Sequence, residues 1–104
     1  MTAPALSTWL NNTTKEQPIL LDVREDSEFM HCHIDGSLHI PMNTIPNKLS
    51  ELSIDKEIVC ICHHGVRSMQ VAMFLEQNGF TQISNLTGGV HSWALDVDNS
   101  MPTY

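Results

Sequence analysis

Seven consecutive residues, from Cys62 to Ser68, read Cys-His-His-Gly-Val-Arg-Ser and combine a thiol, a glycine and an arginine in one short segment. A cysteine in a loop that leads into a helix lies among backbone N–H groups and near the positive end of the helix dipole. Both favour the thiolate, which is the nucleophilic form of the side chain. Arg67 adds a fixed positive charge and a planar set of donors that suits an oxyanion. The segment therefore predicts a nucleophile and an anion site within one loop.

The residues on either side of this loop predict a strand before it and a helix after it. The apolar run from Ile58 to Ile61 is typical of a buried strand, and residues 68–78 have the spacing of an amphipathic helix. Further strands are predicted at residues 19–23, 38–40 and 82–86, and short helices at residues 25–30, 47–52 and 90–94. Alternating strands and helices predict an α/β fold, with a central parallel sheet flanked by helices on both faces.

Chemically useful residues follow three of the predicted strands. Asp22 and Arg24 come at the end of the first strand, the Cys62 loop follows the central one, and Gly88 and Gly89 follow the last. In parallel α/β sheets, ligands bind beyond the carboxyl ends of the strands. The sequence therefore predicts that these three segments meet at one edge of the sheet.

Four blocks of sequence resemble the rhodanese-like sulfurtransferases. One is the loop Cys-x-x-Gly-x-Arg-Ser at residues 62–68, and the others are residues 20–29 (with Leu-Leu-Asp-Val-Arg-Glu), 33–41 and 85–93. Their order and spacing over roughly residues 16 to 96 make a chance resemblance improbable. The resemblance implies a single rhodanese-like domain over residues 1–104, with its core at about 16–96 and a C-terminal tail, 98–104, expected to be poorly anchored.

The resemblance also implies an activity. A rhodanese-type sulfurtransferase moves sulfane sulfur from a donor such as thiosulfate to cyanide or a thiol, through a persulfide on the cysteine that corresponds to Cys62. No cofactor is implied. The expected partners are a small sulfur-donor anion and a thiol or cyanide acceptor, with a protein persulfide as a further candidate donor or acceptor. The residues expected to bind the donor are His63, His64, Gly65, Val66 and Arg67.

Three further residues are expected to support the loop rather than to react. Asp22 and Arg24 resemble the Asp-x-Arg pair of the family's first block, and Ser68 completes the loop motif. A carboxylate in such a place braces a turn by accepting backbone hydrogen bonds, and an arginine pairs with a nearby acid. His63 stands where many family members carry arginine, which leaves the identity of the donor open.

The composition of the chain limits the partners that it is expected to bind and the cellular compartment that it is expected to occupy. Twelve acidic and five basic side chains give a formal net charge of -7, and no basic stripe is available to neutralise nucleic-acid phosphates. No apolar stretch is long enough to span a membrane. Three cysteines, Cys32, Cys60 and Cys62, form an odd set that favours reduced thiols. We therefore expect a cytoplasmic protein that binds neither nucleic acid nor a membrane.

Three other functions remain open at this point. A noncatalytic interaction module is one, although rhodanese-like domains of that kind commonly lack the cysteine. A phosphatase or arsenate reductase is another, but those enzymes have one more residue between cysteine and arginine than the four that separate Cys62 from Arg67. Metal binding is suggested by His and Cys at residues 31–33 and 60–64, yet neither cluster has the usual ligand spacing. The sequence therefore predicts no metal site.

Overall fold

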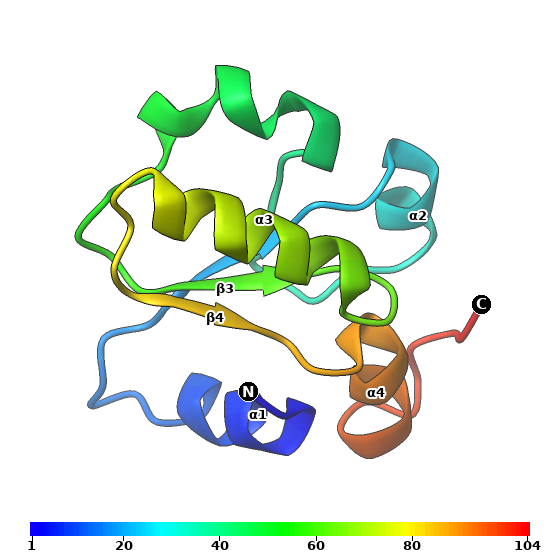
Figure 1. Ribbon diagram of the computed structural model, residues 1–104. Coiled ribbons are helices and arrows are strands. Elements are labelled where there is room, and N and C mark those ends of the chain that lie inside the picture. Colours follow the sequence, from blue (N-terminus) through cyan, green and yellow to red (C-terminus); the bar gives the residue numbers. More distant parts are fainter.

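A parallel sheet of four short strands lies at the centre of the protein, whose computed structural model describes all residues 1–104 (Figure 1). The strands are β1 (Ile19–Asp22), β2 (Leu38–His39), β3 (Ile58–Ile61) and β4 (Ile83–Asn85). Their order across the sheet is β2-β1-β3-β4, and every neighbouring pair is parallel. The predicted α/β class, the parallel sheet and the central position of residues 58–61 are confirmed.

All four residues of β3 are buried, because apolar layers cover both faces of the sheet. Side chains alternate between the faces along a strand. Ile58 and Cys60 accordingly belong to one apolar cluster, and Val59 and Ile61 to the other. Each cluster needs helices to cover it, which explains why helices pack on both sides.

Helix α3 (Val66–Gln77) and two 3-10 turns (Met42–Asn47 and Leu49–Glu51) cover one face of the sheet, and α4 (Gly89–Asp96) lies on the other (Figure 1). Helix α2 (Asp26–His31) follows β1 after a short turn. The helix predicted over residues 47–52 is wrong in type and extent, because the 3-10 turns there begin at Met42 and include Pro46. None of the helices is long and apolar enough to cross a membrane.

A helix that the sequence analysis did not predict, α1 (Ala3–Leu10), packs with α4 under the sheet (Figure 1). The side chain of Thr2 caps its first turn by accepting a hydrogen bond from the Ala5 N–H, and a proline follows at the start of the helix. Ala3 and Leu6 are buried in the apolar cluster of that face. The core therefore begins well before residue 16.

The expectation of a poorly anchored tail over residues 98–104 is wrong. Met101 packs against the apolar cluster beneath the sheet, and the Cys32 thiol donates to the carbonyl oxygen of Pro102 across 3.6 Å. The Tyr104 hydroxyl accepts a hydrogen bond from Arg24 and donates one to Glu28. Side-chain contacts, which no local sequence pattern reveals, hold the end of the chain against the domain.

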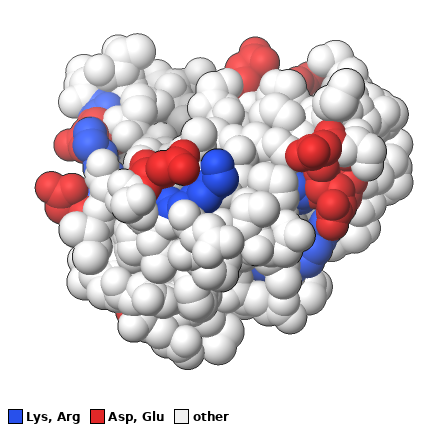
Figure 2. All heavy atoms as spheres, turned by 90° about the horizontal axis from the view of Figure 1, so that it is seen from above, with Lys and Arg blue, Asp and Glu red and all other residues white.

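The charged side chains on one face of the molecule are mixed in sign. In Figure 2 the lysine and arginine atoms lie next to aspartate and glutamate atoms, with no continuous basic stripe on the face that is shown. The structure contains ion pairs between Lys48 and Glu51 and between Lys56 and Glu16, and both are solvent-exposed. This pattern gives nucleic-acid phosphates no extended surface on that face.

Candidate active site

Cys62 lies directly beyond the carboxyl end of β3, in the short loop that leads into α3. Only 1% of the residue is exposed. Gly65 adopts a left-handed backbone conformation (φ +101°), which a side chain would disfavour, and its N–H points at the Cys62 Sγ across 3.0 Å. A backbone donor at this distance stabilises negative charge on the sulfur.

The Ser68 hydroxyl is a second polar group on the cysteine sulfur. It lies 3.2 Å from the Cys62 Sγ and also contacts the Asn85 Oδ1. A hydroxyl has a single proton, so Ser68 donates to one of these atoms at a time and accepts from the thiol in the other arrangement. It therefore suits both the thiol and the thiolate. Ser68 was predicted to support the loop, and the structure places it in direct contact with the sulfur.

The loop also presents backbone donors that no protein group uses. The N–H groups of His64, Val66 and Arg67 donate to no acceptor within the chain. Such groups at the start of a helix are suited to an anion. The Val66 side chain is exposed, as is His64, so this part of the loop faces solvent. A small oxyanion therefore has donors available beside Cys62.

The start of α4 holds the loop from the other side. The Val90 N–H donates to the Cys62 carbonyl oxygen (2.9 Å), and the His91 N–H donates to the His63 carbonyl oxygen (3.1 Å). Gly89, at φ +59°, makes this approach possible, because a Cβ on Gly89 would collide with both of those carbonyl oxygens. The predicted meeting of the Gly88-Gly89 segment with the Cys62 loop is confirmed.

We expect Gly89→Ala to lower the free energy of unfolding by more than about 2 kcal/mol, because it combines backbone strain with a collision against fixed backbone atoms. Gly36→Ala is the matched control. Gly36 also has a positive φ (+83°), but no atom lies within 4 Å of its Cβ position. We expect it to cost only the strain, about 1 kcal/mol. Urea denaturation measures the free energy of unfolding of both variants. Equal losses would contradict the conclusion that Gly89 allows α4 to pack against the Cys62 loop.

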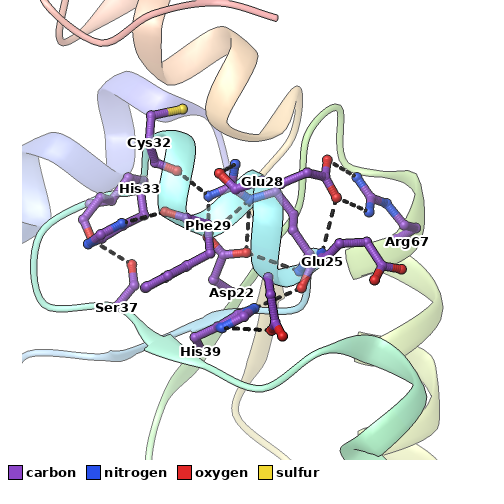
Figure 3. A network of polar contacts seen from close by, with 12 residues as sticks. Asp22, Glu25, Glu28, Phe29, Cys32, His33, Ser37, His39 and Arg67 are labelled. Carbon is purple, nitrogen blue, oxygen red and sulfur yellow. Dashed lines mark hydrogen bonds and ion pairs between the residues drawn. The ribbon is translucent and has the colours of Figure 1, made fainter.

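Arg67 is engaged with a partner that the sequence analysis did not identify. Its Nη1 lies 2.7 Å from the Glu28 Oε1 and its Nη2 lies 2.9 Å from the Glu28 Oε2 (Figure 3). The hydrogen bonds from Arg67 lower the pKa of Glu28 to about 2 and raise the pKa of Arg67. Arg67 was predicted to offer its donors to an oxyanion, whereas here Glu28 of α2 occupies the two terminal nitrogens. Glu28 lies within the first block of sequence that resembles the family. This position was the sequence signal that could have identified its role.

Asp22 and Arg24 form a fully buried ion pair at the end of β1, with both side chains 0% exposed. The Arg24 Nη2 lies 2.7 Å from the Asp22 Oδ2, and it also donates to the Cys32 carbonyl oxygen. Asp22 accepts a further hydrogen bond from the Arg24 N–H. Both residues brace the turn between β1 and α2.

Tyr104 connects this buried pair with the cysteine loop. Its hydroxyl bonds to Arg24 (2.8 Å) and to Glu28 (2.9 Å), and its ring stacks on His63 with 3.7 Å between the ring centroids. Burial raises the pKa of Tyr104 to about 12, so the hydroxyl keeps its proton at neutral pH. No motif in the sequence pointed to this residue. Only the path of the tail brings it to the site.

The other titratable groups near the loop differ from Cys62 in their surroundings. Burial raises the pKa of Cys60 to about 12, which keeps this thiol protonated in the apolar core. The Cys32 thiol lies against the tail at Pro102. Burial, with the charge of His64 as the next contribution, lowers the pKa of His63, so its imidazole is mainly neutral at pH 7. Of the three thiols, Cys62 is the one that lies in the loop with a backbone N–H directed at its sulfur.

Comparison with known proteins identifies the family. The family model described as "Rhodanese-like domain" matches residues 6–96. The Bacillus subtilis protein YtwF is 44% identical over 78 residues, which are 75% of this chain and 75% of YtwF. A sulfurtransferase of Allochromatium vinosum is 37% identical over 79 residues, 76% of this chain and 74% of that protein.

A solved structure agrees with these sequences. The rhodanese-like domain protein from Staphylococcus aureus superposes with a TM-score of 0.85 at 31% identity, over 100% of this chain and 96% of that one. The α/β fold, the cysteine loop at the end of β3 and these relatives lead to one assignment. The relatives of this chain include a protein named as a sulfurtransferase. The chain belongs to the rhodanese-like domain family.

Proposed function

We propose that the protein is a sulfurtransferase that carries sulfur as a persulfide on Cys62. The observation that carries this proposal is the pair of donors on the Cys62 Sγ, the Gly65 N–H at 3.0 Å and the Ser68 hydroxyl at 3.2 Å. Both stabilise a thiolate in a residue that is otherwise buried. The family membership and the similarity to a named sulfurtransferase support the same activity.

The reaction has two steps in which the cysteine alternates between thiolate and persulfide. In the first, the Cys62 thiolate attacks the outer sulfur of a donor such as thiosulfate; a new S–S bond forms, the donor's S–S bond breaks, and sulfite leaves with the electron pair. In the second, cyanide or a thiolate attacks the outer sulfur of the persulfide. The acceptor leaves as thiocyanate or as a new persulfide, and the Cys62 thiolate is restored.

The free N–H groups of His64, Val66 and Arg67 are the proposed binding site for the donor's oxyanion. The Arg67 guanidinium adds positive charge there, but a donor must share it with the Glu28 carboxylate. The net charge of -7 also repels dianions at long range. These features favour the loop N–H groups over the Arg67 side chain as the main contacts of the donor's oxyanion. They are also compatible with a protein persulfide as an alternative donor.

The experiment is to expose the reduced protein to thiosulfate, remove the excess without reducing agent, and map sulfur by peptide mass spectrometry. We expect the peptide with Cys62 to gain one sulfur atom that dithiothreitol removes, because only this thiol combines two polar donors with the loop's anion site. Cys32 and Cys60 serve as internal controls. The same treatment with a polysulfide tests a donor that carries no sulfonate. Absence of sulfur on Cys62 with both donors would contradict the proposal and favour a noncatalytic interaction module.

A further inference from the structure

Three histidine side chains meet beside the cysteine loop. His63 and His64 belong to the loop, and His91 belongs to the first turn of α4. One ring nitrogen from each lies within 4.8 Å of the others. The ring centroids of His63 and His64 are 3.9 Å apart, and those of His64 and His91 are 4.9 Å apart. Only the fold brings these rings together, because His91 is distant in sequence from the loop.

Two ring nitrogens of these histidines lack a hydrogen-bond partner. The His63 Nε2 and the His91 Nδ1 are buried from solvent, and neither makes a hydrogen bond within the protein. Buried polar atoms are nearly always satisfied, because leaving one without a partner costs free energy. Two such nitrogens among three neighbouring histidines leave room for a partner, and a metal ion accepts an electron pair from an unprotonated imidazole nitrogen.

The backbones of two of the three histidines are held in place. The His91 N–H donates to the His63 carbonyl oxygen, so the loop and α4 are joined at this point. The His63 ring is also stacked on Tyr104 with an interplanar angle of 5°. His64 is exposed and is not held in this way. A tetrahedral ion with metal–nitrogen distances of about 2.0–2.1 Å requires the ligand nitrogens to lie roughly 3.3 Å apart, so the three side chains must move closer together to bind one.

We propose that His63, His64 and His91 form a binding site for a divalent transition-metal ion such as Zn²⁺. Imidazole nitrogen suits Zn²⁺, Cu²⁺ and Ni²⁺, whereas Ca²⁺ and Mg²⁺ require oxygen ligands, which this cluster does not offer. Three ligands leave a fourth position open for water or another small ligand. Two of the three ligands belong to the Cys62 loop, but the sulfur transfer proposed for Cys62 needs no metal ion.

This proposal differs from the sequence-based prediction that the protein has no metal site. That prediction considered residues 31–33 and 60–64, in which the candidate ligands are close in sequence. The cluster in the structure uses two histidines of the second group but adds His91 in place of the cysteines. Spacing along the chain gave no indication of it, because the third ligand comes from another helix.

The test is an isothermal titration of Zn²⁺ into the reduced Cys62→Ser variant, which removes the nearest competing thiol. We expect one ion per chain with a dissociation constant in the micromolar range, and at least about a tenfold weaker affinity in the added variants His64→Asn and His91→Asn. His31→Asn is the matched control, since His31 lies on α2 outside the cluster. It should bind Zn²⁺ like the parent variant.

A second readout separates ligand loss from misfolding. Thermal melting without metal shows whether each variant is folded, and His64→Asn changes an exposed side chain. Absence of saturable binding would overturn the proposal, as would unchanged affinity in folded His64→Asn and His91→Asn proteins or a loss confined to His31→Asn. The titration uses a protein without the Cys62 thiol, so its outcome is independent of the proposed sulfur transfer.

Discussion

Sulfur transfer is expected to fall by at least about 1000-fold when Cys62 is replaced by serine. A serine hydroxyl is scarcely ionised at neutral pH and cannot form a persulfide, so both steps of the proposed reaction are lost. The replacement is nearly isosteric, and the Gly65 N–H and the Ser68 hydroxyl can donate to oxygen as they do to sulfur. The fold should therefore survive. Steady-state transfer from thiosulfate to cyanide measures the loss, and thermal melting verifies the fold.

Cys32→Ser is the matched control for this prediction. It also exchanges one thiol for a hydroxyl, but the Cys32 thiol contacts the tail at Pro102 rather than the loop. We expect this variant to retain most of the activity of the unmodified protein. If the Cys62→Ser protein stays folded and still transfers sulfur, Cys62 is not the sulfur carrier. If the loss occurs only in Cys32→Ser, the carrier has been assigned to the wrong cysteine.

Arg24→Met is expected to lower the free energy of unfolding by about 3–5 kcal/mol, one of the largest effects that a single substitution can have in this protein. The change removes the partner of the fully buried Asp22 carboxylate, and a buried charge without a counter-charge is strongly unfavourable. It also removes the hydrogen bonds from Arg24 to Tyr104 and to the Cys32 carbonyl oxygen. In thermal melting we expect the midpoint to fall by about 12 °C or more.

Two further variants test the cause of that loss. In Asp22→Asn with Arg24→Met no net charge remains buried, so we expect this double variant to be more stable than Arg24→Met alone. Lys48→Met removes a basic residue from the exposed ion pair with Glu51 and should change stability by less than about 1 kcal/mol. A loss below 1 kcal/mol in Arg24→Met, or a double variant less stable than the single one, would contradict the proposed role of the buried pair.

The two ion pairs and Tyr104 form a connected network that supports the cysteine loop. Arg24 links Asp22 to the Tyr104 hydroxyl, and that hydroxyl links in turn to Glu28. Glu28 then holds Arg67, at the start of the helix that follows Cys62 (Figure 3). The charged residues predicted near the site thus act mainly on one another. This arrangement leaves the backbone N–H groups of the loop as the free donors for an anion.

The sequence by itself determined the fold class, the approximate position of each strand and the candidate nucleophile. β3 was predicted correctly because an uninterrupted apolar run of four residues can be buried on both faces only in a covered sheet. The Cys62 loop was identifiable because its residues are contiguous, and a contiguous motif does not depend on the rest of the fold. α1 was missed, although Thr2 and Pro4 are suitable residues for a helix start.

Only the tertiary structure decided how the side chains around that loop are paired. Glu28 and Arg67 come from different helices, Tyr104 comes from the tail, and His91 meets His63 and His64 only because α4 packs against the loop. Each of these contacts joins residues far apart along the chain, and their partners depend on the packing of whole elements. Local patterns record burial and backbone preference, whereas the pairing of polar groups is set by three-dimensional proximity. The candidate nucleophile could therefore be read from the sequence, and its surroundings could not.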